Sequence, residues 1–236
     1  LLKRFDLPGH SIIDESGFNF ARKCNLGAKV SRGEILVFLN DETQFLTENW
    51  IDSVVSLLTE DDVACVGGML INEDGTVQSC GDLVGAWSAN HYDPDPLAEN
   101  VGDPMQRYVV DHETCSISGA FFCCQKSIFS SLGGFSLAFP NSFQDVDFCL
   151  RARRQQLRCI MSPSIRLLHF ESSSREPAVD DETLQMLRTI HADLLAPLDS
   201  FQLWRYQPIR VRWLSYHGLP HVRNLIKTFI KQSLSK

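Results

Sequence analysis

Apolar and polar residues alternate along the chain in blocks whose periods predict helices and strands in turn. Residues 18–34 place apolar side chains at helical spacing, which predicts a helix that Gly33 ends. Residues 35–39 are continuously apolar, which is typical of a strand buried on both faces of a sheet. Helical spacing returns in residues 47–62, with Thr47 at the start. The face of the first helix that we expect to be buried consists of Phe20, Cys24, Ala28 and Val30.

The middle of the chain predicts a second buried strand and a hairpin. Residues 63–71 are again almost continuously apolar, and Asp74-Gly75 follows them as a strong short-range hairpin signal. Residues 82–110 are irregular and rich in proline and acidic side chains. A loop of this length inside a compact domain is usually functional or mobile.

The pattern then returns to strands and helices. Residues 116–135 predict a short strand and a helix stopped by Gly133. Residues 142–156 predict a helix that opens with acids and runs into arginines, which suits the helix dipole. Residues 158–169 predict short strands ending at His169. This alternation of elements predicts an α/β protein.

The pattern of apolar and polar residues changes after Pro177, which predicts a domain of residues 1–177 and a C-terminal helical extension of residues 178–236. The extension ends in a basic amphipathic helix, because residues 201–236 hold seven basic side chains and no Asp or Glu. The first helix of the extension presents one apolar face, made of Leu184, Leu187, His191, Leu194 and Leu195.

Composition narrows the class of protein. A chain of 236 residues that is 44% hydrophobic can bury one good core, and no run of eighteen apolar residues predicts a transmembrane helix. None of the eight cysteines forms a CxxC pair, so a zinc site is not predicted. Their apolar surroundings favour small buried side chains in a reducing compartment, the cytoplasm, over a disulfide framework.

The net charge of −7 is unevenly distributed. The first 200 residues carry 15 basic and 29 acidic groups, or −14, and the basic tail follows. The acidic body argues against nucleic acid as a partner. Two interpretations of residues 201–236 stay open: peripheral contact with an anionic membrane at its inner face, or a terminal helix packed on the domain.

Five stretches together resemble the successive motifs of family-2 glycosyltransferases. These are inverting, metal-dependent enzymes of the GT-A fold, and the stretches look most similar to the rhamnosyltransferase-like bacterial branch. They span residues 18 to 175 in order. They read FNFARKCNLGAKVSRGEILVFLNDET, INEDGTVQSCG, SISGAFFCCQKSIFSSLGGF, FQDVDFCLR and LLHFESSSR.

The resemblance implies a Rossmann-like mixed sheet flanked by helices, with C-terminal helices after it. Family members begin with a strand and loop that hold the nucleotide base. Residues 1–17 look like the end of that section, so we expect the GT-A domain to be truncated at its N-terminus.

The resemblance also implies a metal site. Transferring a sugar from a nucleotide diphosphate requires a stabilised leaving group, and Mg²⁺ or Mn²⁺ held by carboxylates can bridge its phosphates. Asp41 and Glu42 match the acidic pair, and His169 matches a metal- or diphosphate-binding histidine. Glu42 stands where Asp is usual, which moves the carboxylate by roughly 1.5 Å. A solvated acidic turn and an ordinary histidine are the alternatives.

The general base of an inverting transfer matches Asp145, the first acid of the QDVD stretch. At a helix N-terminus its carboxylate is expected to stay ionised at neutral pH. First-turn acids also occur for helix stability alone, and we expect this structural role for Asp147, which has Arg151 at i+4.

Substrate-binding residues follow from the same resemblance. One pair lies on the helix flanking the donor pocket, and the small residues of 118–120 line the acceptor side. The residues assigned in this way to substrate and cofactor binding are Arg22, Asn25, Asp41, Ser118 and Gly119.

The sequence therefore predicts an inverting glycosyltransferase that acts on a glycan or lipid-linked acceptor in polysaccharide biosynthesis. A non-catalytic glycosyltransferase-like module or inactive fragment is the main alternative, because of Glu42 and the missing N-terminal strand. A nucleotidyltransferase is disfavoured because the chain has no Gly-rich phosphate loop.

Overall fold

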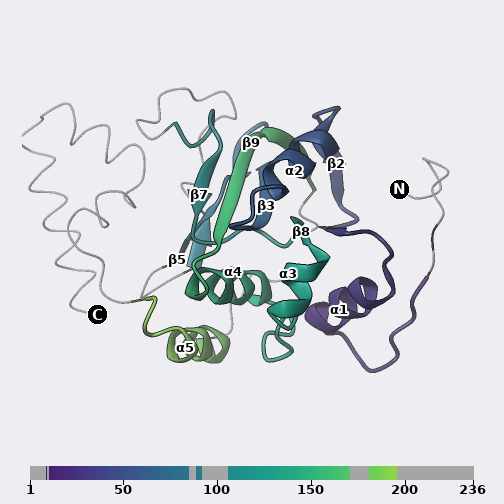
Figure 1. The fold of residues 1–236 in the computed structure, drawn as a ribbon, viewed down its shortest axis with the longest axis vertical. Coiled ribbons are helices and arrows are strands. Elements are labelled where there is room, and N and C mark those ends of the chain that lie inside the picture. The colour runs from purple at the N-terminus through teal and green to yellow at the C-terminus, as the bar shows by residue number, and fades with distance from the viewer. Residues whose placement is uncertain (1–8, 10, 85–88, 92–105, 171–180, 196–236) are drawn as a thin grey trace, which may run out of the picture.

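The fold is a mixed α/β domain, and its computed structural model describes residues 9, 11–84, 89–91, 106–170 and 181–195 (Figure 1). The predicted alternation of helices and strands is confirmed over this part of the chain. In chain order the elements are α1 Phe20–Val30, β1 Ile35–Leu39, β2 Thr43–Phe45, α2 Trp50–Leu58, β3 Val63–Ile71, β4 Val77–Ser79, β5 Asp82–Val84, β6 Ala89–His91, β7 His112–Thr114, β8 Phe121–Gln125, α3 Lys126–Ser131, α4 Gln144–Arg154, β9 Arg158–His169 and α5 Asp181–Ile190.

The main sheet has the order β1-β8-β3-β9-β2, with β4 paired to β3 and β7 paired to β9. The central pair, β3 and β9, is parallel, whereas β8 runs antiparallel to both β1 and β3. The sheet is therefore mixed, as predicted. Strands β5 and β6 form a separate antiparallel pair within the stretch expected to be irregular.

Helices cover both faces of this sheet. On one face, Val54 and Leu58 of α2 pack with Val66 and Leu70 of β3 in one apolar cluster. On the other face α1, α3 and α4 contribute to a second cluster, which includes Phe148 of α4. All nine residues of β3 are buried, as expected for a strand covered on both sides.

The prediction that residues 35–39 form a strand buried on both faces is wrong in its burial. In β1 only Leu36 is fully buried, and Val37 is 40% exposed. Val37 is exposed because β1 is an edge strand, which within the described residues pairs only with β8.

The prediction that Gly33 ends the first helix is wrong, because α1 ends three residues earlier, at Val30. Ser31 ends the helix instead: its backbone turns to an extended conformation while its hydroxyl donates to the carbonyl of Ala28. Val30 is 59% exposed, so it does not belong to the buried face. At the other end, Asn19 accepts a hydrogen bond from the backbone N–H of Arg22 and caps the helix.

Two other boundaries differ from the prediction. Helix α2 begins at Trp50 because the hydroxyl of Thr47 is used elsewhere, donating to the carbonyl of Ser164 on β9. The short strands expected at 158–169 are one strand, β9, despite Pro163. Its pairing with β3 skips from Ser162 to Arg166, which accommodates a proline that has no N–H to donate.

The predicted hairpin is confirmed. Strands β3 and β4 pair antiparallel around Gly75, whose φ of 83° is the left-handed conformation that glycine adopts without strain. The backbone N–H of Asn72 donates to the carbonyl of Thr76 at 2.9 Å and closes the turn. This hairpin carries Gln78 along the edge of the candidate site.

Helix α5 lies outside α4 (Figure 1) and packs on it through Leu187. Its buried His191 contacts Asp147 on α4, with 2.9 Å between Nε2 and Oδ1. The expected i+4 pair is also present, because Arg151 Nε donates to Asp147 Oδ2 at 2.8 Å. Leu194 is 38% exposed rather than buried, because the helix ends at Ile190 and helical spacing ends with it.

Burial alone would raise the pKa of Asp147, but the hydrogen bonds from His191 and Arg151 outweigh it and lower the pKa. Asp147 therefore stays ionised and holds α4 and α5 together.

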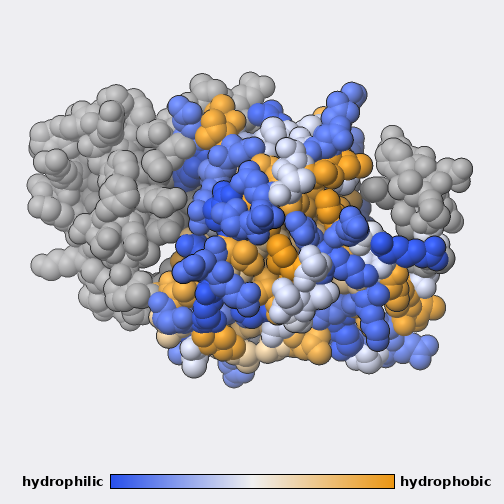
Figure 2. Space-filling model, viewed as in Figure 1, coloured by the Kyte–Doolittle hydropathy of each residue, from blue (hydrophilic) through white to orange (hydrophobic). Residues whose placement is uncertain are grey.

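On the face shown in Figure 2, polar and apolar side chains are interspersed. Apolar side chains gather over β2 and α2, where Leu46, Ile51 and Val55 are exposed. No helix within the described residues is long and apolar enough to cross a bilayer. The predicted basic tail, residues 201–236, lies outside the part that the structure describes.

Candidate active site

The acidic turn at the end of β1 is held between two other strands. The backbone N–H of Asn40 donates to the carbonyl of Ala120 just before β8, at 2.9 Å. On the other side, the N–H of Phe170 donates to the carbonyl of Glu42 at 2.8 Å. The side chain of Asp41 is exposed and that of Glu42 is half-buried. The turn is therefore fixed by its backbone, and Asp41 presents its carboxylate to solvent.

His169 lies beside this turn, although 126 residues separate it from Thr43 in the sequence. The antiparallel pairing of β2 with β9 places His169 opposite Thr43. Its Nδ1 lies 2.6 Å from Oε1 of Gln78, and its Nε2 lies 3.4 Å from Nδ2 of Asn40. Because an amide oxygen can only accept, Nδ1 carries the proton and Nε2 keeps its lone pair.

These residues fit a divalent cation of the Mg²⁺ or Mn²⁺ type. Asp41 and Glu42 offer carboxylate oxygens, and Gln78 holds His169 in the tautomer that leaves Nε2 available as a ligand. In the described residues, however, these three side chains do not form a cluster with ligand atoms within 4.8 Å of one another. Such a site resembles those in which Mg²⁺ takes one or two carboxylates and completes its shell with water and substrate phosphates.

Replacing Gln78 by leucine is expected to lower the affinity for Mn²⁺ and a nucleoside diphosphate by roughly 10- to 100-fold, because His169 loses the partner that sets its tautomer. Calorimetric titration measures this directly. Gln78→Glu keeps an acceptor oxygen and should retain binding, and Gln44→Leu, on an exposed residue of β2, is the matched control. Equal loss in the leucine and glutamate variants would contradict this role.

Asp145, the second residue of α4, faces the turn at 118–120. Its Oδ2 accepts a hydrogen bond from the N–H of Gly119 at 2.6 Å, and its Oδ1 accepts one from the N–H of Val146 at 2.9 Å. A Cβ at Gly119 would lie 3.2 Å from Oδ2, so glycine permits this close approach. The predicted site residues Asp145 and Gly119 are thus in direct contact.

The pKa of Asp145 is raised to about 6, first by burial and then by the nearby carboxylate of Asp82. The sequence interpretation relied on the helix N-terminus to keep this group ionised, but burial moves its pKa upward. A pKa of about 6 still leaves most of the carboxylate ionised at pH 7. A base whose pKa lies near the working pH suits proton transfer from a hydroxyl.

Asp82 is the residue that sequence reasoning missed at this end of the site. Its side chain is 5% exposed, and its Oδ2 accepts a hydrogen bond from the hydroxyl of Ser116 at 2.6 Å. Gln78 and Asn40 were also not predicted as site residues. Asn40 could have been recognised in the sequence from its place in the acidic turn. Gln78 lies in the second strand of the hairpin and Asp82 lies just after it, and both reach the site only through strand pairing.

Two residues predicted to flank the donor pocket have local contacts. Arg22 forms an ion pair with Asp14, with 2.8 Å between Nε and Oδ2. The hydroxyl of Ser16, followed by Arg22 and the N–H of Ser16, lowers the pKa of Asp14 to about 2. Asn25 exchanges two hydrogen bonds with the backbone of Phe135, at 2.8 and 2.9 Å. These contacts give both residues a structural role, and their contact with a nucleotide sugar stays a prediction.

Ser118 shapes the turn between the base and the acidic residues. Its side-chain oxygen lies 3.3 Å from the N–H of Ala120, and its carbonyl accepts from the N–H of Phe121. The segment 118–120 therefore connects Asp145, through Gly119, with the acidic turn, through Ala120. Every predicted catalytic and metal residue lies along this one edge of the sheet.

Comparison of the sequence with known proteins finds relatives over about two thirds of the chain. Over 159 residues the chain is 33% identical to the O-antigen biosynthesis protein RfbC of Myxococcus xanthus, a match that covers 67% of this chain and 12% of that protein. It is 29% identical over 164 residues to the uncharacterized protein y4gI of Sinorhizobium fredii (strain NBRC 101917 / NGR234), covering 69% of this chain and 18% of that protein. The chain thus spans only a small part of either relative. No family model matches it.

Two solved structures share its fold. GalNAc-T7 with UDP, GalNAc and Mn²⁺ superposes with a TM-score of 0.59 at 12% identity, covering 80% of this chain and 38% of that one. The mannosyltransferase PcManGT from Pyrobaculum calidifontis, in complex with GDP-Man and Mn²⁺, gives a TM-score of 0.50 at 13% identity, with coverages of 98% and 65%. The chain has the GT-A glycosyltransferase fold. For this GT-A domain the predicted fold class is confirmed, and the rhamnosyltransferase-like branch stays a prediction.

Proposed function

We propose that this GT-A domain transfers a sugar from a nucleotide-diphosphate donor to a hydroxyl group of an acceptor, with inversion at the anomeric carbon. The observation that carries the proposal is that a candidate proton acceptor and the candidate metal ligands lie close together along one edge of the sheet. Asp145 contacts Gly119, and the next residue, Ala120, contacts Asn40 of the acidic turn. A proton acceptor and a set of metal ligands are thus separated by a single turn of small residues.

In this proposal Asp145 accepts the proton of the acceptor hydroxyl, and the resulting oxygen nucleophile attacks the anomeric carbon. The bond from that carbon to the diphosphate breaks, so the configuration inverts. Asp41, Glu42 and His169 would hold Mg²⁺ or Mn²⁺, which when bound neutralises the charge that develops on the diphosphate. Gly119 lets the acceptor approach the backbone, and its N–H holds Asp145 in place.

The relative from Myxococcus xanthus is an O-antigen biosynthesis protein, which supports a glycan acceptor. We therefore propose a saccharide or lipid-linked saccharide acceptor in polysaccharide biosynthesis, used in the cytoplasm. Residues 201–236 would supply contact with the membrane surface, because their seven basic side chains favour anionic lipid.

A non-catalytic glycosyltransferase-like module is the second candidate. It is favoured by Glu42 at the position where the resemblance expects Asp, and by the absence of a preformed cluster among Asp41, Glu42 and His169. Such a module would bind a glycan without requiring metal.

Calorimetric titration of UDP, GDP and dTDP into the 236-residue chain, with and without Mn²⁺, separates the two candidates. Sugar transfer predicts that at least one nucleotide binds only when Mn²⁺ is present. A folded chain that binds none of the three, or binds a glycan equally well without metal, would favour the non-catalytic module.

The rate of transfer is expected to rise with pH through about 6 and to level off above pH 7, because Asp145 acts only when it is deprotonated. Measuring kcat/KM between pH 4.5 and 8.5 at saturating Mn²⁺ tests this. Replacing Asp82 by asparagine removes the neighbouring negative charge, so the midpoint should move to lower pH. A midpoint unchanged in Asp82→Asn would contradict the contribution of Asp82 and leave burial as the cause of the raised pKa.

A further inference from the structure

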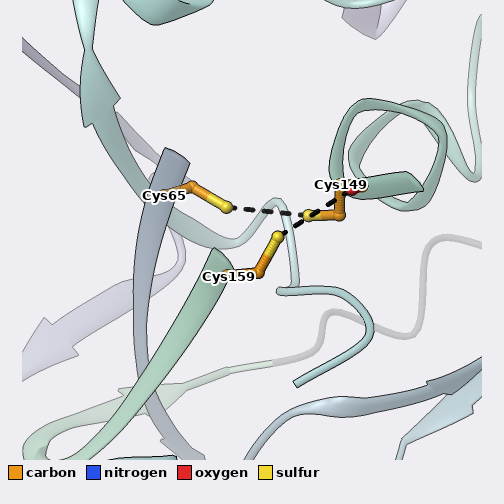
Figure 3. Close-up of side chains that lie close together, drawn as sticks. All are labelled: Cys65, Cys149 and Cys159. Carbon is orange, nitrogen blue, oxygen red and sulfur yellow. Dashed lines mark hydrogen bonds between the residues drawn. The ribbon is translucent and has the colours of Figure 1, made fainter. Parts of the chain in front are cut away.

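Three thiols from three different elements meet in the core beneath α4. Cys65 of β3 and Cys159 of β9 are register partners on neighbouring parallel strands, and Cys149 of α4 points toward both (Figure 3). The Sγ atoms of Cys65 and Cys149 lie 3.7 Å apart, and all three Sγ atoms lie within 4.8 Å of one another. Each residue is fully buried, and all eight cysteines of the chain are free.

The spacing of the sulfur atoms matches a thiolate metal centre. Tetrahedral Zn²⁺ with Zn–S bonds of about 2.3 Å places two sulfur ligands about 3.8 Å apart. The separation of 3.7 Å between Cys65 and Cys149 is already close to this value. Thiolate ligands select soft d¹⁰ ions such as Zn²⁺ and Cu⁺, whereas the oxygen ligands of the sugar-transfer site suit Mg²⁺ or Mn²⁺.

The surrounding charge is also suitable. Three thiolates around a divalent or monovalent cation leave a net negative centre in the core, which needs compensation. The guanidinium of Arg153, one turn after Cys149 on α4, interacts electrostatically with the sulfur of Cys115 and, more weakly, with that of Cys159.

We infer that Cys65, Cys149 and Cys159 form a structural binding site for a soft d¹⁰ metal ion, Zn²⁺ or Cu⁺. Bound there, the ion joins the two central strands to α4, the helix whose first turn holds the proposed base Asp145. The sequence did not indicate this site, because its ligands are far apart in the chain and form no CxxC pair. The site is separate from the proposed sugar-transfer chemistry and does not depend on it.

The test is loading by refolding, because fully buried sulfurs are accessible to an ion only before the core closes. The full chain is refolded without oxygen in a phosphine reductant with Zn²⁺ or Cu⁺, desalted, and assayed for metal per chain. We expect one ion per chain with at least one of the two metals, and at least a tenfold lower content in Cys149→Ala. Cys123→Ala should retain the ion, because this residue is equally buried in β8 but belongs to the apolar cluster on the opposite face of the sheet.

A folded wild-type chain that retains neither metal would overturn the inference, as would equal metal content in Cys149→Ala and wild type. If Cys149→Ala does not fold, X-ray absorption spectroscopy of the loaded wild-type chain decides the matter. Three sulfur ligands at the distance typical of thiolates support the site, and fewer than three overturn it.

Discussion

Replacing Asp145 by asparagine is expected to lower the rate of sugar transfer by a factor of roughly 10² to 10⁴, the usual contribution of a general base. The amide oxygen can still accept the hydrogen bond from the N–H of Gly119, and only the local bond from the N–H of Val146 is lost, so the start of α4 should keep its shape. Binding of the nucleotide and Mn²⁺ should change little, because their proposed ligands lie on the other side of the turn at 118–120. Steady-state kinetics with a calorimetric titration of the nucleotide separates the two effects.

The same variant has a second signature, in stability. Because the folded state raises the pKa of Asp145 to about 6, ionisation of this carboxylate opposes folding as the pH rises through that value. Asparagine removes the opposition, so Asp145→Asn should be more stable than wild type at pH 8, on the order of 1–2 kcal/mol after allowance for partial exposure. The gain should vanish below pH 4, where both forms are neutral.

Asp52→Asn is the matched control, because Asp52 is also an acid in the first turn of a helix but is exposed on α2. It should leave transfer and the pH dependence of stability unchanged. If Asp145→Asn retained the activity of wild type, Asp145 would not be the base, whatever its effect on stability.

Removing the carboxylate of Glu42 by alanine is expected to weaken Mn²⁺-dependent nucleotide binding by ~100-fold, about what loss of one charged ligand contributes. The backbone of Glu42 is held by the N–H of Phe170, so the turn should survive the change. Calorimetry with the nucleotide that binds the wild-type chain best measures the loss. Transfer should fall in parallel, because the leaving diphosphate would lose its stabilising charge.

Glu42→Asp and Glu48→Ala complete this experiment. Aspartate restores the residue that the family resemblance expects, so binding should be retained or improved. Glu48 is an exposed acid just before α2, and its loss should have no effect. Undiminished metal-dependent binding in Glu42→Ala would leave Asp41 and His169 as the ligands and exclude Glu42.

Local sequence determined most of the elements and indicated several candidate site residues. Continuous apolar residues predicted β3, Asp74-Gly75 predicted the hairpin, and the acids followed by arginines predicted α4, because each signal acts over a few neighbouring residues. The ordered motifs also identified the GT-A fold and assigned Asp41 and Asp145 their proposed roles. These residues lie at element ends, where the sequence alone indicates exposure to a ligand.

Tertiary structure decided how these residues meet. The pairing of β2 with β9 brings His169 to Thr43, and the β3–β4 hairpin brings Gln78 to His169. The raised pKa of Asp145 depends on burial and on the nearby Asp82. The exposure of Val37 depends on the position of β1 as the last strand of the sheet. Strand register and burial arise from contacts between residues far apart in the chain. The local pattern of apolar and polar residues does not depend on such contacts, so only the folded structure could reveal them.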